Sequence, residues 1–229
     1  MLLKRFGPNL NGRDFVVGDI HGQLSALSAA MAGVSFNKAV DRLFMLGDLV
    51  DRGADSFDCL KLVYEAWANS ILGNHEVMMR AALMPGAKDS DLLHWIKSGG
   101  NWFFNEDTRE LTQVGLDAIS RMPYAIELEV DGKLLGLVHA EPPVEGWEFL
   151  RTLESWADDE LITDVQDQMI WSRKRIRSND ETIVAGVDAV VCGHSIVEAP
   201  RRLGNVNYID TGAYTVNGRL TIMDVRELF

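Results

Sequence analysis

Short apolar runs alternate with helical patterns through the first half of the chain. Three of these runs are brief and bounded by glycine or charge, which is typical of buried strands: Phe15–Val17, Leu43–Leu46 and Ile71–Leu72. Between them, apolar residues recur at helical spacing, first from Leu24 to Val34 and then from Phe57 to Trp67. This rhythm of strand, helix and strand predicts a parallel sheet with right-handed crossovers.

The middle of the chain is helical, and strand signals dominate after it. Ser90 is suited to cap a helix that stops at Gly99-Gly100, and Asp107–Glu110 has the form of a capping box. Two turn signals, Asp131-Gly132 and Asn217-Gly218, each predict a hairpin between flanking apolar segments. Further strands are predicted at 187–191 and 206–209. The class is therefore mixed α/β.

Length and composition indicate one globular domain. The 229 residues are 47% hydrophobic and 24% charged, which excludes a disordered or collagen-like chain. Because no repeat or Pro/Ser-rich linker divides the sequence, we expect a single domain over 1–229. Leu24–Phe36 is the longest uncharged apolar stretch, but it contains Ser and Gly at helical spacing, so no membrane span is predicted. Met1–Pro8 lacks the apolar run of a signal peptide, so we expect no export.

The charge balance narrows the classes of partner. Lys and Arg number 22 against 34 Asp and Glu, giving a net charge of −12 that disfavours a nucleic-acid backbone as the ligand. A small anionic substrate stays compatible if local cations reverse the field in one cleft. The two cysteines, Cys59 and Cys192, lie in apolar runs and cannot form a thiolate metal site. We expect both to be buried in a cytoplasmic protein.

Five apolar strands each end in a side chain that can bind a metal or move a proton. In open α/β sheets the carboxyl ends of the strands line the ligand crevice, so these side chains can converge there. The glycines among them let the backbone turn sharply and approach an ion closely. The five strand ends are Gly18-Asp19-Ile20-His21-Gly22, Gly47-Asp48-Leu49-Val50-Asp51-Arg52-Gly53, Gly73-Asn74-His75-Glu76, His139-Ala140 and Gly193-His194-Ser195.

The donor set predicts two divalent ions. Oxygen and imidazole donors without thiolates suit manganese, iron or zinc better than calcium or a structural zinc. Six protein ligands exceed what one catalytic ion with an open position needs, but they fit two ions that share one carboxylate. The candidate ligands are Asp19, His21, Asp48, Asn74, His139 and His194.

These strand ends, together with Ile209-Asp210-Thr211-Gly212-Ala213, carry a resemblance. In order and spacing they resemble the signature of the calcineurin-like metallophosphoesterases, and within that superfamily the bacterial and bacteriophage lambda-type serine/threonine protein phosphatases. The match spans about Gly18 to Ala213. It implies a metallophosphoesterase sandwich, in which two packed mixed β-sheets are flanked by helices and a dinuclear metal site lies at one edge.

The resemblance also implies a role for each site residue. His75 matches the general acid, with Asp51 as the carboxylate that orients it. Arg52 and Arg173 match phosphate-binding arginines, and Asn74 counts both as a phosphate-binding residue and as a metal ligand. The metal ligands divide between two ions that share Asp48: Asp19, His21 and Asp48 for one, and Asp48, Asn74, His139 and His194 for the other.

We therefore expect a metal-dependent phosphomonoester hydrolase that uses a hydroxide bridging two metal ions. Its substrates would be phosphoserine and phosphothreonine in proteins or peptides, with extension to phosphotyrosine and small phosphomonoesters. Manganese is the expected metal, with iron, zinc or nickel as alternatives. A symmetrical dinucleoside tetraphosphate hydrolase is the rival enzyme, because it uses very similar motifs. A scaffold that binds metal without turnover is the rival from another class, and the presence of His75 and Arg52 argues against it.

Three features stay open at the level of sequence. The acidic stretch from Glu154 to Asp167, followed by the basic run Arg173–Arg177, fits either a solvated helix face or a flap over the substrate. Trp102-Phe103-Phe104 fits either the core or a cleft wall. Glu141-Pro142-Pro143, directly after His139-Ala140, differs from the loop of many relatives and leaves the specificity of the rim undetermined.

Overall fold

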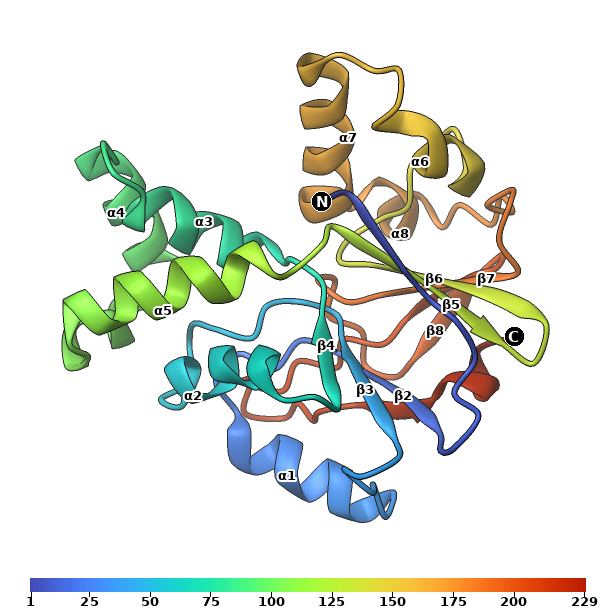
Figure 1. The fold of residues 1–229 in the computed structure, drawn as a ribbon, viewed down its shortest axis with the longest axis horizontal. Coiled ribbons are helices and arrows are strands. Elements are labelled where there is room, and N and C mark those ends of the chain that lie inside the picture. Colours follow the sequence, from blue (N-terminus) through green and yellow to red (C-terminus); the bar gives the residue numbers. More distant parts are fainter.

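Two β-sheets pack face to face in the computed structural model, which describes residues 1–229 (Figure 1). In the six-stranded sheet the order is β1 (Leu3–Phe6), β5 (Ala125–Val130), β6 (Lys133–Val138), β7 (Ala189–Cys192), β9 (Val206–Tyr208) and β8 (Arg201–Leu203). In the four-stranded sheet it is β10 (Ile222–Asp224), β2 (Asp14–Val17), β3 (Arg42–Met45) and β4 (Ala68–Ser70). Both sheets mix parallel and antiparallel pairs, so the predicted sandwich of mixed sheets is confirmed.

Strand periodicity explains how the apolar residues divide. Successive side chains of a strand point to opposite faces of its sheet. Val16 therefore lies in the cluster between the sheets, with Phe44, Ile126 and Val191. Its neighbours in β2 belong to the larger cluster, which joins the sheets to the surrounding helices. Because both faces of the sheet are covered, every residue of β2 is buried.

Helices cover the outer faces of the sandwich (Figure 1). One group, α3 to α5, forms a lobe to one side, and a second group, α6 to α8, lies above the six-stranded sheet. The α-helices are α1 (Leu24–Gly33), α2 (Ser56–Lys61), α3 (Asn74–Leu83), α4 (Asp89–Lys97), α5 (Thr108–Ser120), α6 (Trp147–Leu153), α7 (Asp159–Trp171) and α8 (Lys174–Ser178). The 3-10 helices are η1 (Leu62–Tyr64), η2 (Gly100–Asn105) and η3 (Val225–Leu228). None of the helices is both long and apolar enough to cross a membrane.

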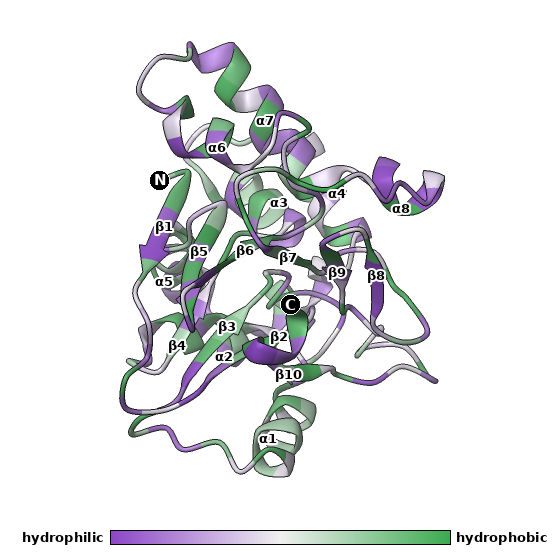
Figure 2. Ribbon diagram, turned by 90° about the vertical axis from the view of Figure 1, so that its right-hand side faces the viewer, coloured by the Kyte–Doolittle hydropathy of each residue, from purple (hydrophilic) through white to green (hydrophobic).

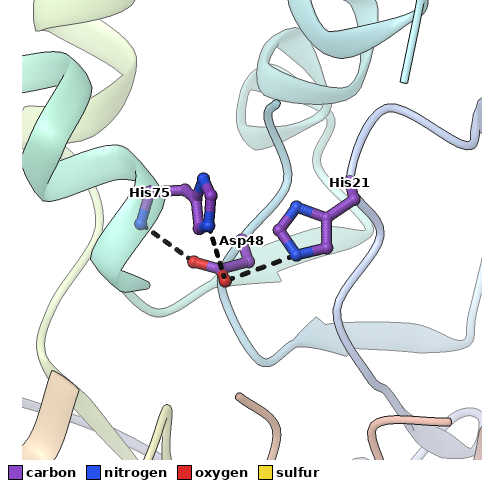
Figure 3. Close-up of side chains that lie close together, drawn as sticks. All are labelled: His21, Asp48 and His75. Atoms are coloured by element: carbon purple, nitrogen blue, oxygen red, sulfur yellow. Dashed lines mark hydrogen bonds and ion pairs between the residues drawn. The ribbon is translucent and has the colours of Figure 1, made fainter. Parts of the chain in front are cut away.

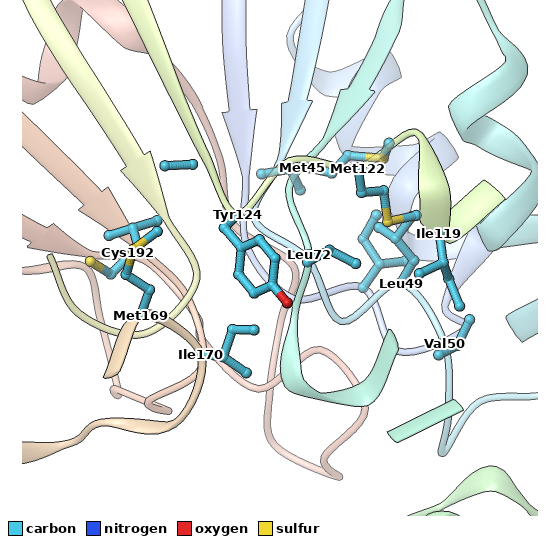
Figure 4. Packing of buried hydrophobic residues seen from close by; sticks show 14 of the residues in the cluster. Met45, Leu49, Val50, Leu72, Ile119, Met122, Tyr124, Met169, Ile170 and Cys192 are labelled. Atoms are coloured by element: carbon cyan, nitrogen blue, oxygen red, sulfur yellow. The ribbon is translucent and has the colours of Figure 1, made fainter. Parts of the chain in front are cut away.

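Apolar packing ties the helices to the strand ends. Figure 2 shows that hydrophobic residues concentrate on the central strands and on the helix faces toward them. Figure 4 shows Leu72 and Tyr124, next to the strand ends, in one cluster with Met169 and Ile170 of α7. The residues beside these strand ends are therefore packed against α7 in the hydrophobic core.

Several predicted elements match the structure closely. The parallel pairing of β2, β3 and β4 follows the predicted rhythm, with Val17 opposite Met45 and Met45 opposite Ser70. The hairpin of β5 and β6 turns at Asp131 and Gly132, whose φ angles are 49° and 79°, as a two-residue turn of the favoured type requires. Asp107 caps α5 by accepting the N–H of Glu110.

The second predicted hairpin is wrong. No strand precedes Asn217-Gly218; instead the backbone closes a loop, in which Arg219 N–H donates to the carbonyl of Thr211 at 3.1 Å. Val216 is fully exposed, so burial does not favour a strand there. The strand that follows, β10, pairs with β2 at the edge of the four-stranded sheet.

Smaller errors concern where elements begin and end. The strand predicted at Ile71–Leu72 ends at Ser70, and the two apolar residues lie buried just beyond it. The helix predicted from Phe57 to Trp67 ends at Lys61 and continues as a 3-10 turn to Tyr64. Helix α4 begins one residue before Ser90, and β1 was not predicted.

Candidate metal centre and phosphate pocket

The predicted ligands follow the ends of β2, β3, β4, β6 and β7; Asn74 is the first residue of α3, and the others lie in loops. Because β2, β3 and β4 run parallel, and β6 and β7 run parallel, the carboxyl ends of each set meet at one edge. All six predicted ligands are at least 94% buried, since none is more than 6% exposed. Most of them border one cavity of about 270 Å³, which is lined by Asp19, Asp48, Arg52, Asn74, His75, Arg173, His194, Ile196 and Tyr214.

Backbone strain is concentrated at these loops. Eight residues other than glycine have positive φ, and five of them are predicted site residues: His21, Asp48, Asp51, Arg52 and His194. The left-handed conformation costs free energy for a residue with a Cβ atom and persists where the surrounding structure imposes it. Its concentration here indicates that the loops are shaped for the placement of side chains at the expense of local stability.

Two groups of ligand atoms share Asp48. In the first group, the atoms of Asp48, His139 and His194 all lie within 4.8 Å of one another. In the second group the same holds for His21, Asp48 and His75, whose arrangement Figure 3 shows. Asp48 Oδ1 lies 3.4 Å from His139 Nε2, and Asp48 Oδ2 lies 3.5 Å from His21 Nε2. The two oxygens of one carboxylate thus face the two groups.

Hydrogen bonds to the backbone fix the tautomers of two imidazoles. His21 Nδ1 lies 2.9 Å from the carbonyl oxygen of Val50, and His139 Nδ1 lies 2.7 Å from that of Leu46. A carbonyl oxygen only accepts, so each Nδ1 carries the proton and each Nε2 keeps a lone pair. Burial lowers the pKa of His21 to about 3 and also lowers the pKa of His139. Neutral rings that keep a lone pair on Nε2 are the form that binds metals.

The surroundings of these nitrogens fit a cation. His139 Nε2 faces Asn74 Oδ1 at 2.9 Å, and both atoms carry lone pairs directed into the same space. His194 Nε2 is buried without a hydrogen-bond partner, and burial lowers the pKa of His194 to about 3. Buried acceptors facing one another are unfavourable unless a positive charge lies between them. The donor set of imidazole, amide and carboxylate matches divalent ions such as manganese, iron or zinc.

Asp19 enters the site differently from the other ligands. Both of its carboxylate oxygens accept the backbone N–H of His194, at 3.1 and 3.0 Å, while the side chain lines the cavity. Burial and the nearby carboxylates of Asp210 and Asp48 raise the pKa of Asp19 well above its ordinary value. A cation in the cavity would relieve this repulsion. The ligand group of His21, Asp48 and His75 does not include Asp19, and the predicted binding of one ion by Asp19, His21 and Asp48 stays a prediction.

Two glycines allow the carboxylates to approach the backbone. A Cβ atom on Gly193 would lie 2.1 Å from Asp19 Oδ1, and one on Gly73 would lie 2.2 Å from Asp48 Oδ1. Neither distance leaves room for a side chain. Gly73 and Gly193 are therefore required by their contact with two of the predicted ligands.

His75 and Asp51 form a buried pair, and two tryptophans complete it. His75 Nδ1 lies 2.6 Å from Asp51 Oδ2, and Asp51 is fully buried. The indole N–H of Trp95 donates to Asp51 Oδ1 at 2.9 Å, and that of Trp102 donates to the same oxygen at 2.7 Å. Burial disfavours the charged imidazole, but Asp48 and Asp51 outweigh it and raise the pKa of His75. The tryptophans explain how a carboxylate is kept in the core.

Arg52 and Arg173 both reach the cavity. The guanidinium of Arg52 donates to His21 Nε2 at 2.7 Å, and its Nη2 lies 3.0 Å from His75 Nε2. It lies over the ring of Tyr214, with 4.2 Å between Arg52 Cζ and the ring centroid. Arg173 Nη2 donates to the carbonyl of His194 at 3.3 Å. The cavity therefore has two guanidinium groups beside the ligand atoms, an arrangement suited to an anion with several oxygens.

Sequence reasoning missed several residues that hold the site. Glu76 lies in the first turn of α3. Its carboxylate also accepts the backbone N–H groups of Asp48 at 2.8 Å, Leu49 at 2.7 Å and Gly73 at 2.9 Å. Trp95, Tyr214 and Asp210 were not predicted as site residues. For Trp95 one signal existed, since a buried indole N–H needs an acceptor.

Comparisons with known proteins agree with this geometry. A family model described as calcineurin-like phosphoesterase matches residues 15–198. Serine/threonine-protein phosphatase 1 of Salmonella typhimurium is 32% identical over 214 residues, which cover 93% of this chain and 91% of the relative. A symmetrical bis(5'-nucleosyl)-tetraphosphatase of Actinobacillus pleuropneumoniae is 43% identical over 72 residues, which cover 31% of this chain and 27% of that protein.

Solved structures with a similar fold include phosphatases. The structure of a protein serine/threonine phosphatase from Saccharomyces cerevisiae matches with a TM-score of 0.60 and 16% identity, over 93% of this chain and 72% of the other. At that identity the likeness concerns the fold alone. The family match, however, covers most of the chain and includes the loops that carry the candidate ligands. The chain therefore belongs to the calcineurin-like phosphoesterase family.

Proposed function

We propose that this chain is a metal-dependent phosphoprotein phosphatase that hydrolyses phosphoserine and phosphothreonine esters, with phosphotyrosine as a further substrate. The observation that carries the proposal is the convergence, on one cavity, of neutral imidazole and carboxylate ligand atoms with two arginines. The serine/threonine-protein phosphatase of Salmonella supports the substrate class, because the similarity extends over 93% of this chain. Small phosphomonoesters should be accepted as well.

We propose two divalent ions at this site, with manganese as the preferred metal and iron, zinc or nickel as alternatives. When bound, the ions would neutralise phosphate charge and lower the pKa of a coordinated water. The lone pairs of His139 and His194 and the facing acceptor of Asn74 support the assignment, while the lone pair of His21 accepts from Arg52 in this structure. The proposed ligands are Asp19, His21, Asp48, Asn74, His139 and His194.

The two arginines would bind the phosphate. Each guanidinium presents a planar fork of N–H donors that can match two phosphate oxygens. The guanidinium nitrogens of Arg52 lie 2.7 Å from His21 Nε2 and 3.0 Å from His75 Nε2 in this structure, so its donors already point into the cavity. As negative charge on the phosphate oxygens shifts during hydrolysis, these fixed donors stabilise it without reorganisation of solvent. The amide of Asn74, beside the same cavity, would contribute to phosphate binding.

His75 would protonate the leaving alkoxide. Its Nδ1–H donates to Asp51, which fixes the ring so that Nε2 faces the cavity. A proton held on Nε2 is then placed for transfer to the leaving oxygen of serine or threonine. The Asp51 carboxylate favours the protonated ring, because opposite charges at 2.6 Å attract. The tryptophan donors keep that carboxylate in position.

A panel of substrates on manganese-loaded protein tests the function. We expect phosphate release from a phosphoserine peptide and little cleavage of diadenosine tetraphosphate. Diadenosine tetraphosphate is the natural comparison because of the symmetrical bis(5'-nucleosyl)-tetraphosphatase relative. Its match covers only 72 residues, but at 43% identity, against 32% for the Salmonella phosphatase. Cleavage of the dinucleotide with no action on the peptide would overturn the proposal in favour of that activity. Inactivity toward both, with two ions bound, would favour a scaffold without turnover.

We also propose a cytoplasmic location. Cys59 and Cys192 are both unpaired and buried, and burial raises the pKa of the Cys59 thiol to about 12, which keeps it unreactive. A protein that relies on no disulfide suits a reducing compartment. Cell fractionation of the native protein tests this, and recovery outside the cytoplasm would contradict it.

A further inference from the structure

The loop after His139 makes a buried connection to the segment that carries Arg173. Glu141 is only 4% exposed, and each of its carboxylate oxygens accepts one hydrogen bond. Ser172 Oγ donates to Oε2 at 2.5 Å, and the backbone N–H of Arg175 donates to Oε1 at 2.7 Å. The two donors lie on either side of Arg173 in the chain, so one carboxylate spans the segment that holds this arginine.

Neighbouring contacts keep the same two segments together. The N–H of Ala140 donates to the carbonyl of Met169 at 2.7 Å, and Gln168 Nε2 donates to the carbonyl of Pro142 at 2.9 Å. These bonds fix the end of α7, but they stop before Arg173. Between residues 172 and 175, the connection to the strand-end loop is made by Glu141.

The side chain of Arg175 is occupied elsewhere. Its Nη1 donates to the carbonyls of Asp180 at 2.9 Å and Thr182 at 2.8 Å. The Arg175 side chain therefore forms no ion pair with Glu141. Arg175 contacts Glu141 through its backbone N–H alone. Arg173, by contrast, directs its guanidinium to the cavity and makes a single long bond of 3.3 Å, to the carbonyl of His194. Its placement depends on the backbone that carries it.

We propose that Glu141 is a positioning residue for phosphate binding, which holds the backbone around Arg173 so that its guanidinium faces the cavity. The inference rests on the proposed function only in taking phosphate as the ligand of Arg173. Without the carboxylate, Arg173 must be ordered when the anion binds. Ordering one long side chain weakens binding by up to about tenfold.

A double-mutant cycle with inorganic phosphate as the probe tests this. Calorimetry on manganese-loaded protein would measure the dissociation constant of phosphate for wild type, Glu141→Ala, Arg173→Ala and the double variant. We expect Glu141→Ala to weaken phosphate binding about tenfold. In the Arg173→Ala background the same change should have almost no effect, because no guanidinium is left to position. Glu145→Ala, an exposed glutamate of the same loop, is the matched control and should leave binding unchanged.

Further variants separate positioning from a general loss of structure. Glu141→Gln keeps an acceptor for the N–H of Arg175, and the Ser172 hydroxyl can rotate to accept from the new amide, so binding should recover most of the loss. In turnover of a phosphoserine peptide, Glu141→Ala should raise KM while kcat stays within about twofold. Metal content should equal that of the wild type.

Two results would overturn the inference. One is phosphate binding unchanged in Glu141→Ala, and the other is an equal loss with and without Arg173. Because calorimetry needs no turnover, the proposed function can fail separately. If the wild type does not hydrolyse the peptide but the effect of Glu141→Ala still depends on Arg173, the phosphatase proposal is overturned and the role of Glu141 stands. If the wild type hydrolyses the peptide but the effect of Glu141→Ala does not depend on Arg173, the role of Glu141 is overturned and the phosphatase proposal stands.

Discussion

The Nδ1 atom of His75 lies 2.6 Å from a carboxylate oxygen of Asp51, in a part of the protein from which solvent is excluded. This bond leaves the other ring nitrogen toward the cavity. His75→Asn should therefore lower kcat for a phosphoserine peptide by roughly 10²–10⁴-fold, the usual worth of a general acid. The effect on p-nitrophenyl phosphate should be much smaller, because its leaving group needs no proton.

Metal content decides between two roles for His75. It lies in one group with His21 and Asp48, so a ligand role is a distinct hypothesis. If His75 is the acid, elemental analysis of His75→Asn should find as much manganese as in the wild type. Loss of one ion from the variant would contradict the assignment.

The indole donors to Asp51 make a second prediction. Trp95→Phe and Trp102→Phe keep most of the aromatic volume but remove the N–H groups that donate at 2.9 and 2.7 Å. Each variant removes one of the donors to a buried carboxylate. We therefore expect the free energy of unfolding to fall by about 1–3 kcal/mol and kcat to be reduced in each variant. Chemical denaturation and steady-state kinetics measure both. Trp156 is exposed, so Trp156→Phe should change neither the stability nor kcat. Equal losses in all three variants would show that ring size matters and that the indole N–H does not.

Gly193 provides a test of the close approach to Asp19. In Gly193→Ala the new methyl group would need the space of Asp19 Oδ1, 2.1 Å away, so either the carboxylate or the loop must move. We expect lower metal affinity by calorimetry and activity reduced by at least about tenfold. Gly33→Ala is the matched control, since its Cβ atom would meet nothing within 4 Å. Normal manganese binding in Gly193→Ala would contradict the predicted placement of Asp19.

Asp41, remote from the site, predicts a pH dependence of stability. Its oxygens accept the N–H and a guanidinium N–H of Arg13, each at 2.8 Å, and the N–H of Asn37 at 2.9 Å. Burial opposes ionisation, but these donors outweigh it and lower the pKa of Asp41 below its ordinary value. The folded state then binds its proton less readily than the unfolded state, so the stabilisation exists above about pH 4 and is lost as the pH falls through the folded pKa.

The matching variant is Asp41→Asn. At pH 7 it should lower the free energy of unfolding by about 1–3 kcal/mol, and the difference from wild type should shrink as the pH falls through the folded pKa of Asp41. Urea denaturation across this range measures it. Asp164→Asn, on an exposed face of α7, should show no such dependence. A deficit that stays constant with pH would mean that the charge of Asp41 contributes nothing.

The sequence predicts the architecture where pattern and chemistry agree. The strand ends carrying Asp19, Asp48 and His139 could be identified because short apolar runs stop at glycine and a polar donor. Parallel pairing then brings the donors to one edge, as the structure shows. The hairpin at Asp131-Gly132 formed because both flanking segments had apolar faces to bury. The equivalent signal at Asn217-Gly218 had no such support.

Contacts between distant segments were beyond the reach of the sequence. Trp95 and Trp102 donate to Asp51 from the helical lobe, far from Asp51 in the chain. No local sequence pattern identifies Asp51 as their partner. The same is true of Glu141, whose partners lie on the far side of two helices in the chain. Tyr214 stacks on Arg52 through a loop that the pattern predicted as a strand. Such residues depend on packing, which periodicity does not record.

Diffraction from a crystal of the manganese-loaded protein tests the central claim most directly. Anomalous scattering at the manganese edge would locate the ions without reference to activity. We predict two peaks roughly 3.5–4 Å apart, one on each side of the Asp48 carboxylate, the spacing of two-metal hydrolytic sites. A single peak, or peaks away from Asp48 and His139, would contradict the account.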